Sequence, residues 1–436
     1  MTNKPQATVI GAGLAGCEAA WQLLRRGVAV TLHDMKPGKM SPAHASDLFA
    51  ELVCSNSLRS DRLQNAVGLL KEEMRRLDSL IIRAADRARV PAGGALAVDR
   101  DQFSGYITTQ LKAHPLLTFV EGEVTDFPAQ DAIIATGPLT SDAFSEAIAG
   151  LPQGGMLHFY DAAAPIVTRE SINMDRAFKA SRYGRGDDDY INCPMNEEEY
   201  RAFYEALLTA KTAPIHGFEE SRVFEGCMPV ESLARRGEMA LAFGPLKPVG
   251  LIDPHTGRRP YAVLQLRRDD ASDSMYNLVG FQTRLLFPEQ KRVFGMIPGL
   301  EQAEFARYGV MHRNTFLNSP GFLDNQYMMK DSQGVYFAGQ MTGVEGYVES
   351  AASGLHAGLS LAHRLLGKAP VNFPSATAMG ALSRYVSTPN RNYQPMHISF
   401  GLIDPLPERV RGKEQRYLKV AEHALTLIDE IANINQ

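Results

Sequence analysis

Two cysteines lie in segments whose composition suits thiol chemistry. Cys54 belongs to residues 51–57, ELVCSNS, and Cys227 belongs to residues 225–231, EGCMPVE, where a glycine and a proline favour a turn. A thiolate is a strong soft nucleophile, but it acts near neutral pH only where its pKa is lowered or a base is close. Local sequence leaves two interpretations open for each residue, a reactive thiol or a buried inert one.

A glycine-rich turn near the start of the chain has the spacing that holds a dinucleotide. In Gly11-x-Gly13-x-x-Gly16 the first glycine permits a tight turn, the second lets the backbone approach a pyrophosphate, and the third lets helix and strand pack closely. Asp34 ends the following strand, where a carboxylate accepts hydrogen bonds from a ribose. We therefore predict a dinucleotide site made by Gly11, Ala12, Gly13, Leu14, Ala15, Gly16 and Asp34.

The turn alone does not separate FAD from NAD, but two later segments favour FAD. Residues 133–137, IIATG, form an apolar strand that ends at Thr136 and Gly137. Residues 337–340, FAGQ, end in the same way at Gly339 and Gln340. Both place backbone amides at the carboxyl ends of strands, where an open α/β sheet binds its ligand. The sequence therefore predicts a flavoprotein.

His312 lies in a polar cluster, residues 308–315, that follows an apolar run. Such a histidine, taken alone, is more often structural than catalytic. The basic residues of the second half are interspersed with acids, and they make an RNA-binding surface only if the fold gathers them. These residues are Arg235, Arg236, Arg258, Arg259, Arg267, Arg268, Arg284, Lys291 and Arg292.

Composition limits the classes of function. Lys and Arg number 45 against 49 Asp and Glu, so a net charge of −4 gives no global attraction to nucleic acid or an anionic membrane. The four cysteines, including Cys17 and Cys193, are too few and too scattered for a disulfide framework or a zinc site, so we expect no metal. A packing role is favoured for Cys17. With no signal peptide and no apolar run near about 20 residues, we expect a cytoplasmic protein.

The elements that position these residues follow from apolar periodicity. Residues 7–11, 14–26 and 28–32 make a strand, a helix ended by Gly27, and a strand. A polar excursion over residues 36–65 follows, and long ordered excursions are often functional. We then expect helices at 68–77 and at 100–112, the latter capped by Asp99, and strands at 117–124 and 131–135.

From residue 166 the pattern is mixed, with a helix at 197–208 behind an Asn196–Glu199 capping box and a strand at 261–266. A strand at 334–339 and a helix at 346–366 should then complete the first sheet. With 436 residues, we predict an α/β protein. It has a Rossmann-like FAD-binding domain, a three-layer and mostly parallel sheet, with an inserted α+β domain. The expected parts are 1–165 and 305–436 for FAD, and 166–304 for substrate or RNA.

Five segments together resemble a known family. They are GAGLAGCEAA at 11–20, CSNS at 54–57, PAGGALAVDR at 91–100, EGCMP at 225–229 and GVEGYVES at 343–350. This combination resembles the folate- and FAD-dependent tRNA (uracil-5-)-methyltransferases, the TrmFO family, from the first strand to about residue 410. The chain is more distantly similar to the MnmG tRNA-modifying flavoproteins, which share the glycine turn and residues 338–340.

The resemblance implies a reaction. Methylenetetrahydrofolate donates a one-carbon unit, FAD carries and reduces it, NAD(P)H recharges the flavin, and a uracil in the T-loop of tRNA becomes 5-methyluridine. By similarity Cys227 is the thiolate that adds to uracil, and Cys54 is a second thiol near the flavin that acts as base, shield or transient partner. His312 would flank the folate pterin, and Tyr347 would lie near the isoalloxazine.

Leu286 departs from the family pattern, because a lysine is expected there, while Arg284 brings a charge to a usually neutral position. If the lysine contacts folate glutamate or RNA phosphate, its role is displaced or lost here. Four alternatives stay open. They are the same chemistry on ribosomal RNA, an MnmG-like tRNA-modifying flavoprotein, an NAD(P)H–flavin oxidoreductase that uses no RNA, and a flavin-dependent RNA-binding protein without catalysis.

Overall fold

The computed structural model describes residues 4–41, 43–151, 156–162, 164–184, 188–213, 228–309, 311–390, 393–408 and 410–434. For residues 156–162, 311–315 and 434 it describes the backbone only. Cys227 lies outside the described residues, and the side chain of His312 is not described.

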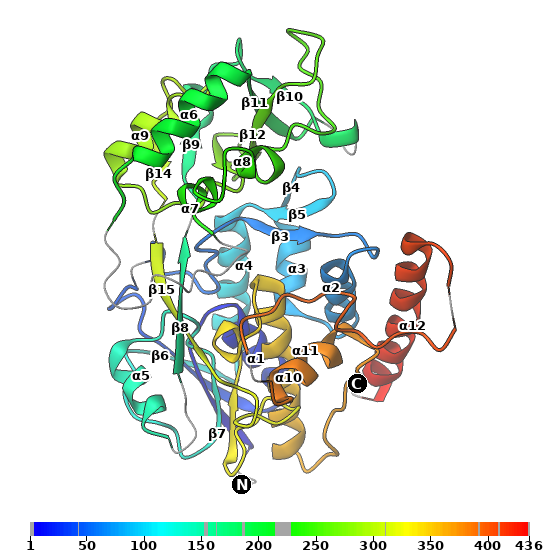
Figure 1. Ribbon diagram of the computed structural model, residues 1–436. Coiled ribbons are helices and arrows are strands. Elements are labelled where there is room, and N and C mark those ends of the chain that lie inside the picture. The colour runs from blue at the N-terminus through cyan, green and yellow to red at the C-terminus, as the bar shows by residue number, and fades with distance from the viewer. Residues whose placement is uncertain are drawn as a thin grey trace.

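A five-stranded parallel sheet forms the lower half of the molecule (Figure 1). Its order is β16-β7-β1-β2-β6, so the first strand is central and the last strand of the chain lies at an edge. Apolar runs form these strands because helices or loops cover both faces of the sheet. The strands are β1 (Gln6–Ile10), β2 (Ala29–Asp34), β6 (Leu117–Glu121), β7 (Gln130–Ile134) and β16 (Gln333–Phe337).

The sheet is the middle of three layers. Val9 and Ile133 face α1 (Leu14–Leu24) and α10 (Tyr347–Leu365), whereas Ile10 and Ile134 pack on α5 (Asp142–Ala149) and residues 317–341. Neighbouring residues on a strand point to opposite faces, so each strand serves both layers. The expected Rossmann-like three-layer fold is confirmed.

Further helices enlarge the layer that contains α1 and α10 (Figure 1). They are α2 (Ala66–Arg76), α3 (Leu80–Arg87), α4 (Arg100–Lys112), α11 (Ala378–Ser387) and α12 (Lys413–Ile434). A small antiparallel sheet stands above them, made of β3 (Ser57–Ser60), β4 (Arg89–Val90) and β5 (Ala95–Val98). None of the described helices combines the length and the apolar character that a bilayer crossing requires.

A second, six-stranded antiparallel sheet forms the upper half (Figure 1). Its order is β10-β11-β12-β13-β9-β14, and its core is separate from that of the first sheet. The strands are β9 (Ile166–Thr168), β10 (Phe178–Lys179), β11 (Tyr190–Met195), β12 (Ala262–Arg268), β13 (Met275–Leu278) and β14 (Phe305–Arg307). The helices are α6 (Glu197–Thr209), α7 (Val230–Ala234), α8 (Ala240–Phe243) and α9 (Phe287–Phe294).

A two-stranded ribbon lies between the two halves (Figure 1). β8 (Met156–Ala162) pairs antiparallel with β15 (Met311–Leu317), so the chain enters and leaves the upper half side by side. Single 3-10 turns lie at η1 (Arg169–Ser171), η2 (Arg182–Gly184) and η4 (Gln340–Thr342). β14 belongs to the second sheet although it begins just beyond residue 304.

Local signals in the sequence located several elements well. Asn196 and Glu199 form the predicted capping box at α6, with both hydrogen bonds at 2.9 Å, and Asp99 accepts from the Gln102 amide at the start of α4. Two strands are shorter than expected. β6 ends at Glu121 and β16 at Phe337, because Gly122 and Gly339 turn the chain with φ of 142° and 86°.

Candidate functional site: a dinucleotide cavity

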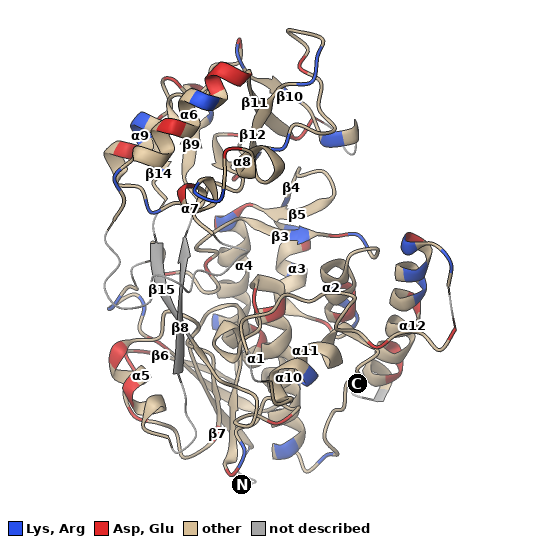
Figure 2. Cartoon of the chain, in the orientation of Figure 1, with Lys and Arg blue, Asp and Glu red and all other residues tan. Residues whose placement is uncertain are grey.

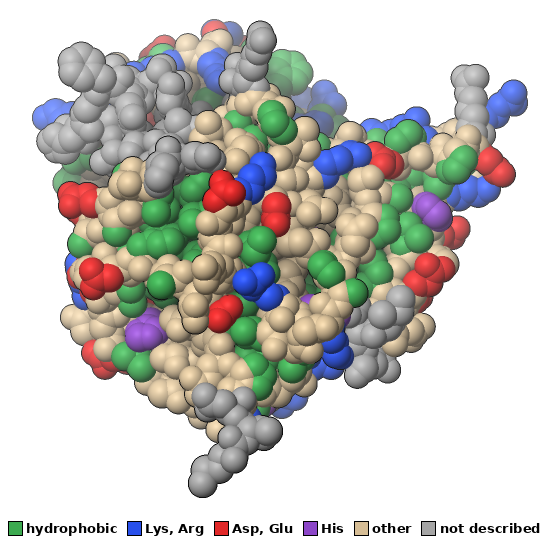
Figure 3. All heavy atoms as spheres, turned by 90° about the horizontal axis from the view of Figure 1, so that it is seen from below, with side chains coloured by type: hydrophobic (Ala, Val, Ile, Leu, Met, Phe, Trp, Pro, Cys, Tyr) green, Lys and Arg blue, Asp and Glu red, His purple; other side chains and the backbone are tan. Residues whose placement is uncertain are grey.

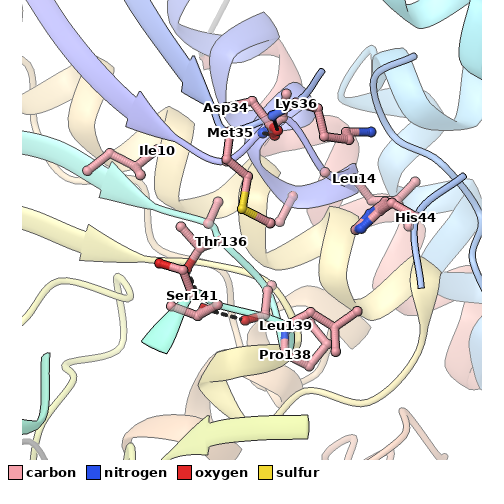
Figure 4. Close-up of a pocket in the computed structure, with 18 of the residues that line it drawn as sticks. Ile10, Leu14, Asp34, Met35, Lys36, His44, Thr136, Pro138, Leu139 and Ser141 are labelled. Atoms are coloured by element: carbon pink, nitrogen blue, oxygen red, sulfur yellow. Dashed lines mark hydrogen bonds between the residues drawn. The ribbon is translucent and has the colours of Figure 1, made fainter. Parts of the chain in front are cut away.

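A cavity opens at the carboxyl ends of β1, β2, β7 and β16 (Figure 4). This edge is where ligands bind in open parallel sheets. Every residue predicted for the cofactor lines this cavity except Gly16. They are Gly11, Ala12, Gly13, Leu14, Ala15, Asp34, Thr136, Gly137, Gly339, Gln340 and Tyr347.

The three glycines of the turn do three different things. Gly11 has φ of 103°, and a Cβ there would lie 2.4 Å from the carbonyl oxygen of Ala135. A Cβ on Gly16 would lie 1.8 Å from the carbonyl oxygen of Gly11, so this residue serves packing and not the ligand. A Cβ on Gly13 would meet no atom within 4 Å. The space beside Gly13 is therefore open for a pyrophosphate to approach the backbone.

Two helices begin at the cavity. α1 starts after Gly13, and α10 starts after Gly346, which has φ of 110°. The first amides of a helix lack partners within the helix and carry partial positive charge, so both ends favour a phosphate. α10 can approach α1 because Gly354 faces it, where a Cβ would lie 2.1 Å from the carbonyl oxygen of Ala15.

Asp34 shapes the turn as well as lining the cavity. Its Oδ2 accepts a hydrogen bond from the Ala12 amide at 2.6 Å, and its Oδ1 accepts from the Lys36 amide at 2.9 Å. Figure 4 shows Asp34, Met35 and Lys36 along one wall of the cavity. The carboxylate thus fixes the glycine turn and remains beside the space where a ribose would lie.

The polar excursion after β2 returns to the cavity and supplies residues that sequence reasoning missed. Lys36 is buried, and its Nζ donates to the carbonyl oxygens of Ser46 at 3.2 Å and Leu48 at 2.6 Å. Glu51 accepts from the Ala45 amide at 3.0 Å and lies 4.0 Å from the Lys36 ammonium. Burial first, and then the Lys36 charge, lower the pKa of His44. The one signal for this wall was the length and polarity of the excursion.

The opposite wall joins segments that are far apart in the chain. The Thr136 and Thr140 hydroxyls lie 2.6 Å apart in the loop after β7. Gln340 donates to both carboxylate oxygens of Glu345, at 2.8 and 2.7 Å, and the Gly339 amide donates to the Ser353 hydroxyl at 2.7 Å. These bonds hold the end of β16 against the start of α10.

Cys54 lies beside this cavity. The Tyr347 hydroxyl accepts hydrogen bonds from the amides of Cys54 at 2.7 Å and Ser55 at 3.1 Å. Tyr347 and Val53 both line the cavity. Burial, and then the negative charge of an ionised Cys54, raise the pKa of Tyr347, so its hydroxyl keeps its proton. The Cys54 thiol is half-buried, and Tyr347 fixes the backbone that carries it.

The second sheet holds the same segment from the other side. Arg267 on β12 donates from Nη2 to the Ser55 hydroxyl at 2.7 Å and from Nε to Asn56 Oδ1 at 3.0 Å. Asn56 is fully buried and donates to the carbonyl oxygens of Val98 and Arg268. Arg100 lies 3.1 Å from the Asp269 carboxylate and donates to the carbonyl oxygen of Leu52. Sequence reasoning missed the bonds from Ser55 and Asn56 to the second sheet because they join residues about two hundred positions apart.

The described residues that follow Cys227 are anchored. Glu231 on α7 is buried and accepts from the Thr283 hydroxyl and from the Arg284 amide, both at 2.9 Å. Burial raises the pKa of Glu231. The Ala213 amide, on the other side of the undescribed segment, donates to the carbonyl oxygen of Arg284 at 2.8 Å. Residues 282–286 therefore hold both flanks of the segment that contains Cys227.

The remaining predicted positions are spread around this region. His312 lies on β15, with its backbone opposite Asp161 of β8. Leu286 is 40% exposed at the start of α9, and the Arg284 guanidinium lies 3.9 Å from the Glu231 carboxylate. The charge of Arg284 is thus engaged inside the protein, and Leu286 presents an apolar side chain at the position where the resemblance predicts a lysine.

Cys17 and Cys193 are fully buried, and burial raises the pKa of both thiols. Cys17 donates from Sγ to the carbonyl oxygen of Ala12 at 3.2 Å, which fits a packing role under the glycine turn. The described part of the chain contains no group of three His, Cys, Asp or Glu residues that could hold a metal ion.

Comparison with known proteins gives the family. The family model of glucose inhibited division protein A matches residues 6–369. A "methylenetetrahydrofolate–tRNA-(uracil-5-)-methyltransferase TrmFO" from Acetivibrio thermocellus is 59% identical over 424 residues, which is 97% of each chain. The chain belongs to the TrmFO family. Proteins of the same name from Listeria monocytogenes and Heliobacterium modesticaldum are each 60% identical over 97% of this chain and cover 98% and 97% of their own lengths.

Solved structures of GidA from Aquifex aeolicus share the fold of this TrmFO chain. The form II crystal gives a TM-score of 0.74 at 14% identity, covering 100% of this chain and 74% of the other. The form I crystal gives 0.70 at 15% identity, covering 99% and 76%. The glycine turn, the empty space beside Gly13 and the two helix starts together fit the pyrophosphate of a dinucleotide.

Proposed function

We propose that this protein is a methylenetetrahydrofolate- and FAD-dependent tRNA (uracil-5-)-methyltransferase. The observation that carries the proposal is the identity of 59–60% over nearly the whole length of relatives that bear this name. A cavity at the end of the parallel sheet that fits a dinucleotide, with Cys54 carried beside it, supports the proposal.

FAD would occupy the cavity, with its pyrophosphate at Gly11–Leu14 and a ribose near Asp34. When bound, FAD supplies the electrons that convert a transferred one-carbon group to a methyl. The residues Thr136, Gly137, Gly339, Gln340 and Tyr347 would hold the remaining parts of the cofactor. Their common place around one cavity supports this assignment.

Two thiols would divide the work on uracil. We assign Cys227 to the nucleophile, whose sulfur bonds to C6 and makes C5 nucleophilic toward the folate methylene carbon. For the step to balance, the bond between that carbon and the folate nitrogen must break and the proton on C5 must leave. Two electrons drawn from NAD(P)H through the flavin would then reduce the transferred carbon to a methyl, and the bond between sulfur and C6 must break. Cys54 is our candidate for the group that accepts this proton, because its backbone is bonded to the cavity residue Tyr347. His312 would flank the folate pterin.

We also propose the division into an FAD-binding part, residues 1–165 and 305–436, and an inserted part, residues 166–304. The separate sheets and cores support it, and the pairing of β14 with β9 favours moving the second boundary beyond Arg307. We place the enzyme in the cytoplasm, where tRNA is found, with NAD(P)H as the source of electrons.

Methylation of an unmodified tRNA transcript by the FAD-loaded protein tests the proposal. With methylenetetrahydrofolate and NADPH supplied, we expect 5-methyluridine in the T-loop, detected by mass spectrometry of nucleosides. Cys227→Ala should leave flavin reduction by NADPH intact and abolish methylation. A variant that methylates at the wild-type rate would contradict the role of Cys227.

The same assay separates the alternatives. Methylation of ribosomal RNA fragments without methylation of tRNA would move the substrate to ribosomal RNA. Methylation with S-adenosylmethionine alone would overturn the folate mechanism. NADPH oxidation with no RNA product under any condition would identify a simple flavin oxidoreductase.

A further inference from the structure

α12 carries its basic residues at the end where helix electrostatics disfavour them. Lys413, Arg416 and Lys419 lie in its first two turns, with Arg411 just before, against the single acid Glu414. Figure 2 shows Lys and Arg gathered in the half of α12 that begins at Lys413. The start of a helix carries partial positive charge, so a cation there is destabilised at low salt.

These cations share one face. Lys413, Arg416 and Lys419 follow each other at intervals of three residues, a spacing that keeps side chains adjacent on a helix. All three and Arg411 are exposed. The other face of α12 is buried in the core of the lower half, through Val420, Ala421, Ala424, Leu425 and Ile428. We call Arg411, Lys413, Arg416 and Lys419 the basic stripe.

Among the residues that the structure describes, the basic stripe has no carboxylate partner. Within the described ranges none of its four residues forms an ion pair, whereas Arg76 on neighbouring α2 is paired with Glu72 and Asp429. Lys413 and Arg416 lie 5.7 and 5.3 Å from the ring centre of Tyr417, which in turn stacks on Phe400 at 4.1 Å. These contacts orient the two cations but leave their charge uncompensated.

The face seen from below has a different distribution of charge (Figure 3). Seen from below, Lys, Arg, Asp and Glu side chains are interspersed (Figure 3). A hollow lined by Phe400, Arg411, Arg416 and Tyr417 adjoins the basic stripe. Of the two acids that also line it, Asp404 is already paired with Arg384 at 2.5 Å. The excess positive charge is therefore local, on a chain whose net charge is −4.

We propose that the basic stripe binds backbone phosphates of the tRNA substrate, at a surface separate from the dinucleotide cavity. This inference rests on the proposed function. From Lys413 to Lys419 the helix rises about 9 Å, a length that spans about two to three phosphates along one strand of a nucleic acid helix. A row of uncompensated cations suits an extended polyanion, which is bound by charge and needs no matching pocket.

The test measures binding of an unmodified tRNA transcript by the FAD-loaded protein over a series of KCl concentrations. The stripe variant is Lys413→Ala/Arg416→Ala/Lys419→Ala. The matched control is Lys4→Ala/Lys330→Ala/Lys368→Ala, which removes the same charge from exposed lysines elsewhere. For the stripe variant, we expect the slope of log K against the logarithm of the KCl concentration to become less steep by about 2–3, because each phosphate contact contributes about 0.7–0.9 to the steepness of that slope. We expect the affinity for tRNA to fall by at least about tenfold. The control should match the wild type.

Kinetics and folding complete the test. The stripe variant should raise KM for tRNA while kcat stays unchanged, because the lost contacts serve ground state and transition state alike. Circular dichroism and melting of both triple variants check folding, and Arg416→Lys, which keeps the charge, should keep the wild-type salt slope.

Each outcome decides between the two proposals. Equal salt slopes in the stripe and control variants, with methylation intact, overturn the basic stripe and leave the proposed function standing. A second outcome is a salt slope that falls only in the stripe variant while the wild-type protein methylates no RNA. That result supports the stripe as an RNA-binding surface and contradicts the proposed function. Wild-type RNA binding by the stripe variant together with lost binding to anionic phospholipid vesicles would assign the surface to a membrane.

Discussion

The glycine cradle and the sheet junction hold the two sides of the candidate site by different physical means. The glycine cradle consists of residues 11–16 and 346–358, where backbones touch and the space is set by missing side chains. The sheet junction consists of residues 52–56 and 92–100 with their partners on the second sheet, where ion pairs and hydrogen bonds cross between the halves.

The difference predicts how each region fails. At Gly11, Gly16 and Gly354 the backbone contacts of the glycine cradle leave no room to adjust, so one methyl added there displaces the cofactor site. The side-chain contacts of the sheet junction are individually replaceable, and each is worth about 1–3 kcal/mol at most. Mutations at the glycine cradle should therefore remove FAD, and mutations at the sheet junction should misplace Cys54 in a protein that still binds FAD.

Gly16→Ala should have the largest effect. The added Cβ would lie 1.8 Å from the Gly11 carbonyl oxygen, and neither backbone atom can move without distorting the turn. We expect purified protein with almost no FAD, measured by absorbance near the flavin bands. Gly105→Ala on α4 is the control, since its Cβ meets nothing within 4 Å and a helix interior prefers alanine by about 0.5–1 kcal/mol. Full FAD content in Gly16→Ala would refute the packing argument.

Arg267→Ala should come next. It leaves the buried Asn56 oxygen without its donor and frees the Ser55 hydroxyl, so we expect a loss of about 1–3 kcal/mol of stability and a roughly 10- to 100-fold lower kcat for methylation. FAD content should not change. Arg268→Ala, the next residue on β12, is the control because Arg268 pairs with Asp273 at 2.9 Å instead. Equal rates for the two variants would show that Arg267 does not position Cys54.

Tyr347→Phe should have a smaller effect at the point where the two regions meet. It removes the hydroxyl that accepts from the Cys54 and Ser55 amides but keeps the ring. We expect kcat to fall about tenfold through misplacement of Cys54, with the dissociation constant for FAD nearly unchanged. If Tyr347→Phe methylates at the wild-type rate, the contacts of the sheet junction alone position Cys54.

Lys71 should give the smallest effect, visible only through pH. Its buried ammonium donates to the carbonyl oxygens of Leu58 at 2.8 Å and Ser60 at 2.6 Å, and burial lowers its pKa to about 7 from 10.5. Between these two values the unfolded chain holds a proton that the folded protein has lost, so the free energy of unfolding should rise with pH. Denaturation of the wild type and of Lys71→Met at pH 7 and pH 10 measures this change in the free energy of unfolding. An equal change with pH in the two proteins would contradict the prediction.

The glycine cradle could be predicted from sequence because its chemistry is local. Gly11, Gly13 and Gly16 with Asp34 fall within a single strand, helix and strand, and short-range rules determine their geometry. Thr136 and Gln340 followed from the same rule at two other strand ends. The bond from the Ala12 amide to Asp34 is a detail that these rules do not give.

The sheet junction could not be predicted, because its partners are chosen by the tertiary fold. Ser55 and Arg267 are 212 positions apart, and neither segment signals the other. The wall formed by Lys36, His44 and Glu51 was indicated only as a polar excursion. α3, α5 and α11 were not expected at all, since their short apolar patterns do not stand out until a core surrounds them.

The contact between Gly354 of α10 and Ala15 of α1 also sets the order of events during synthesis. The ribosome makes α1 first, but the helix that covers it follows more than three hundred residues later. Long-range pairing of this kind is slow and leaves apolar surface uncovered until the partner arrives. A growing chain can complete the antiparallel upper half before its FAD cavity closes, so flavin loading should be a late event, after α10 has left the ribosome.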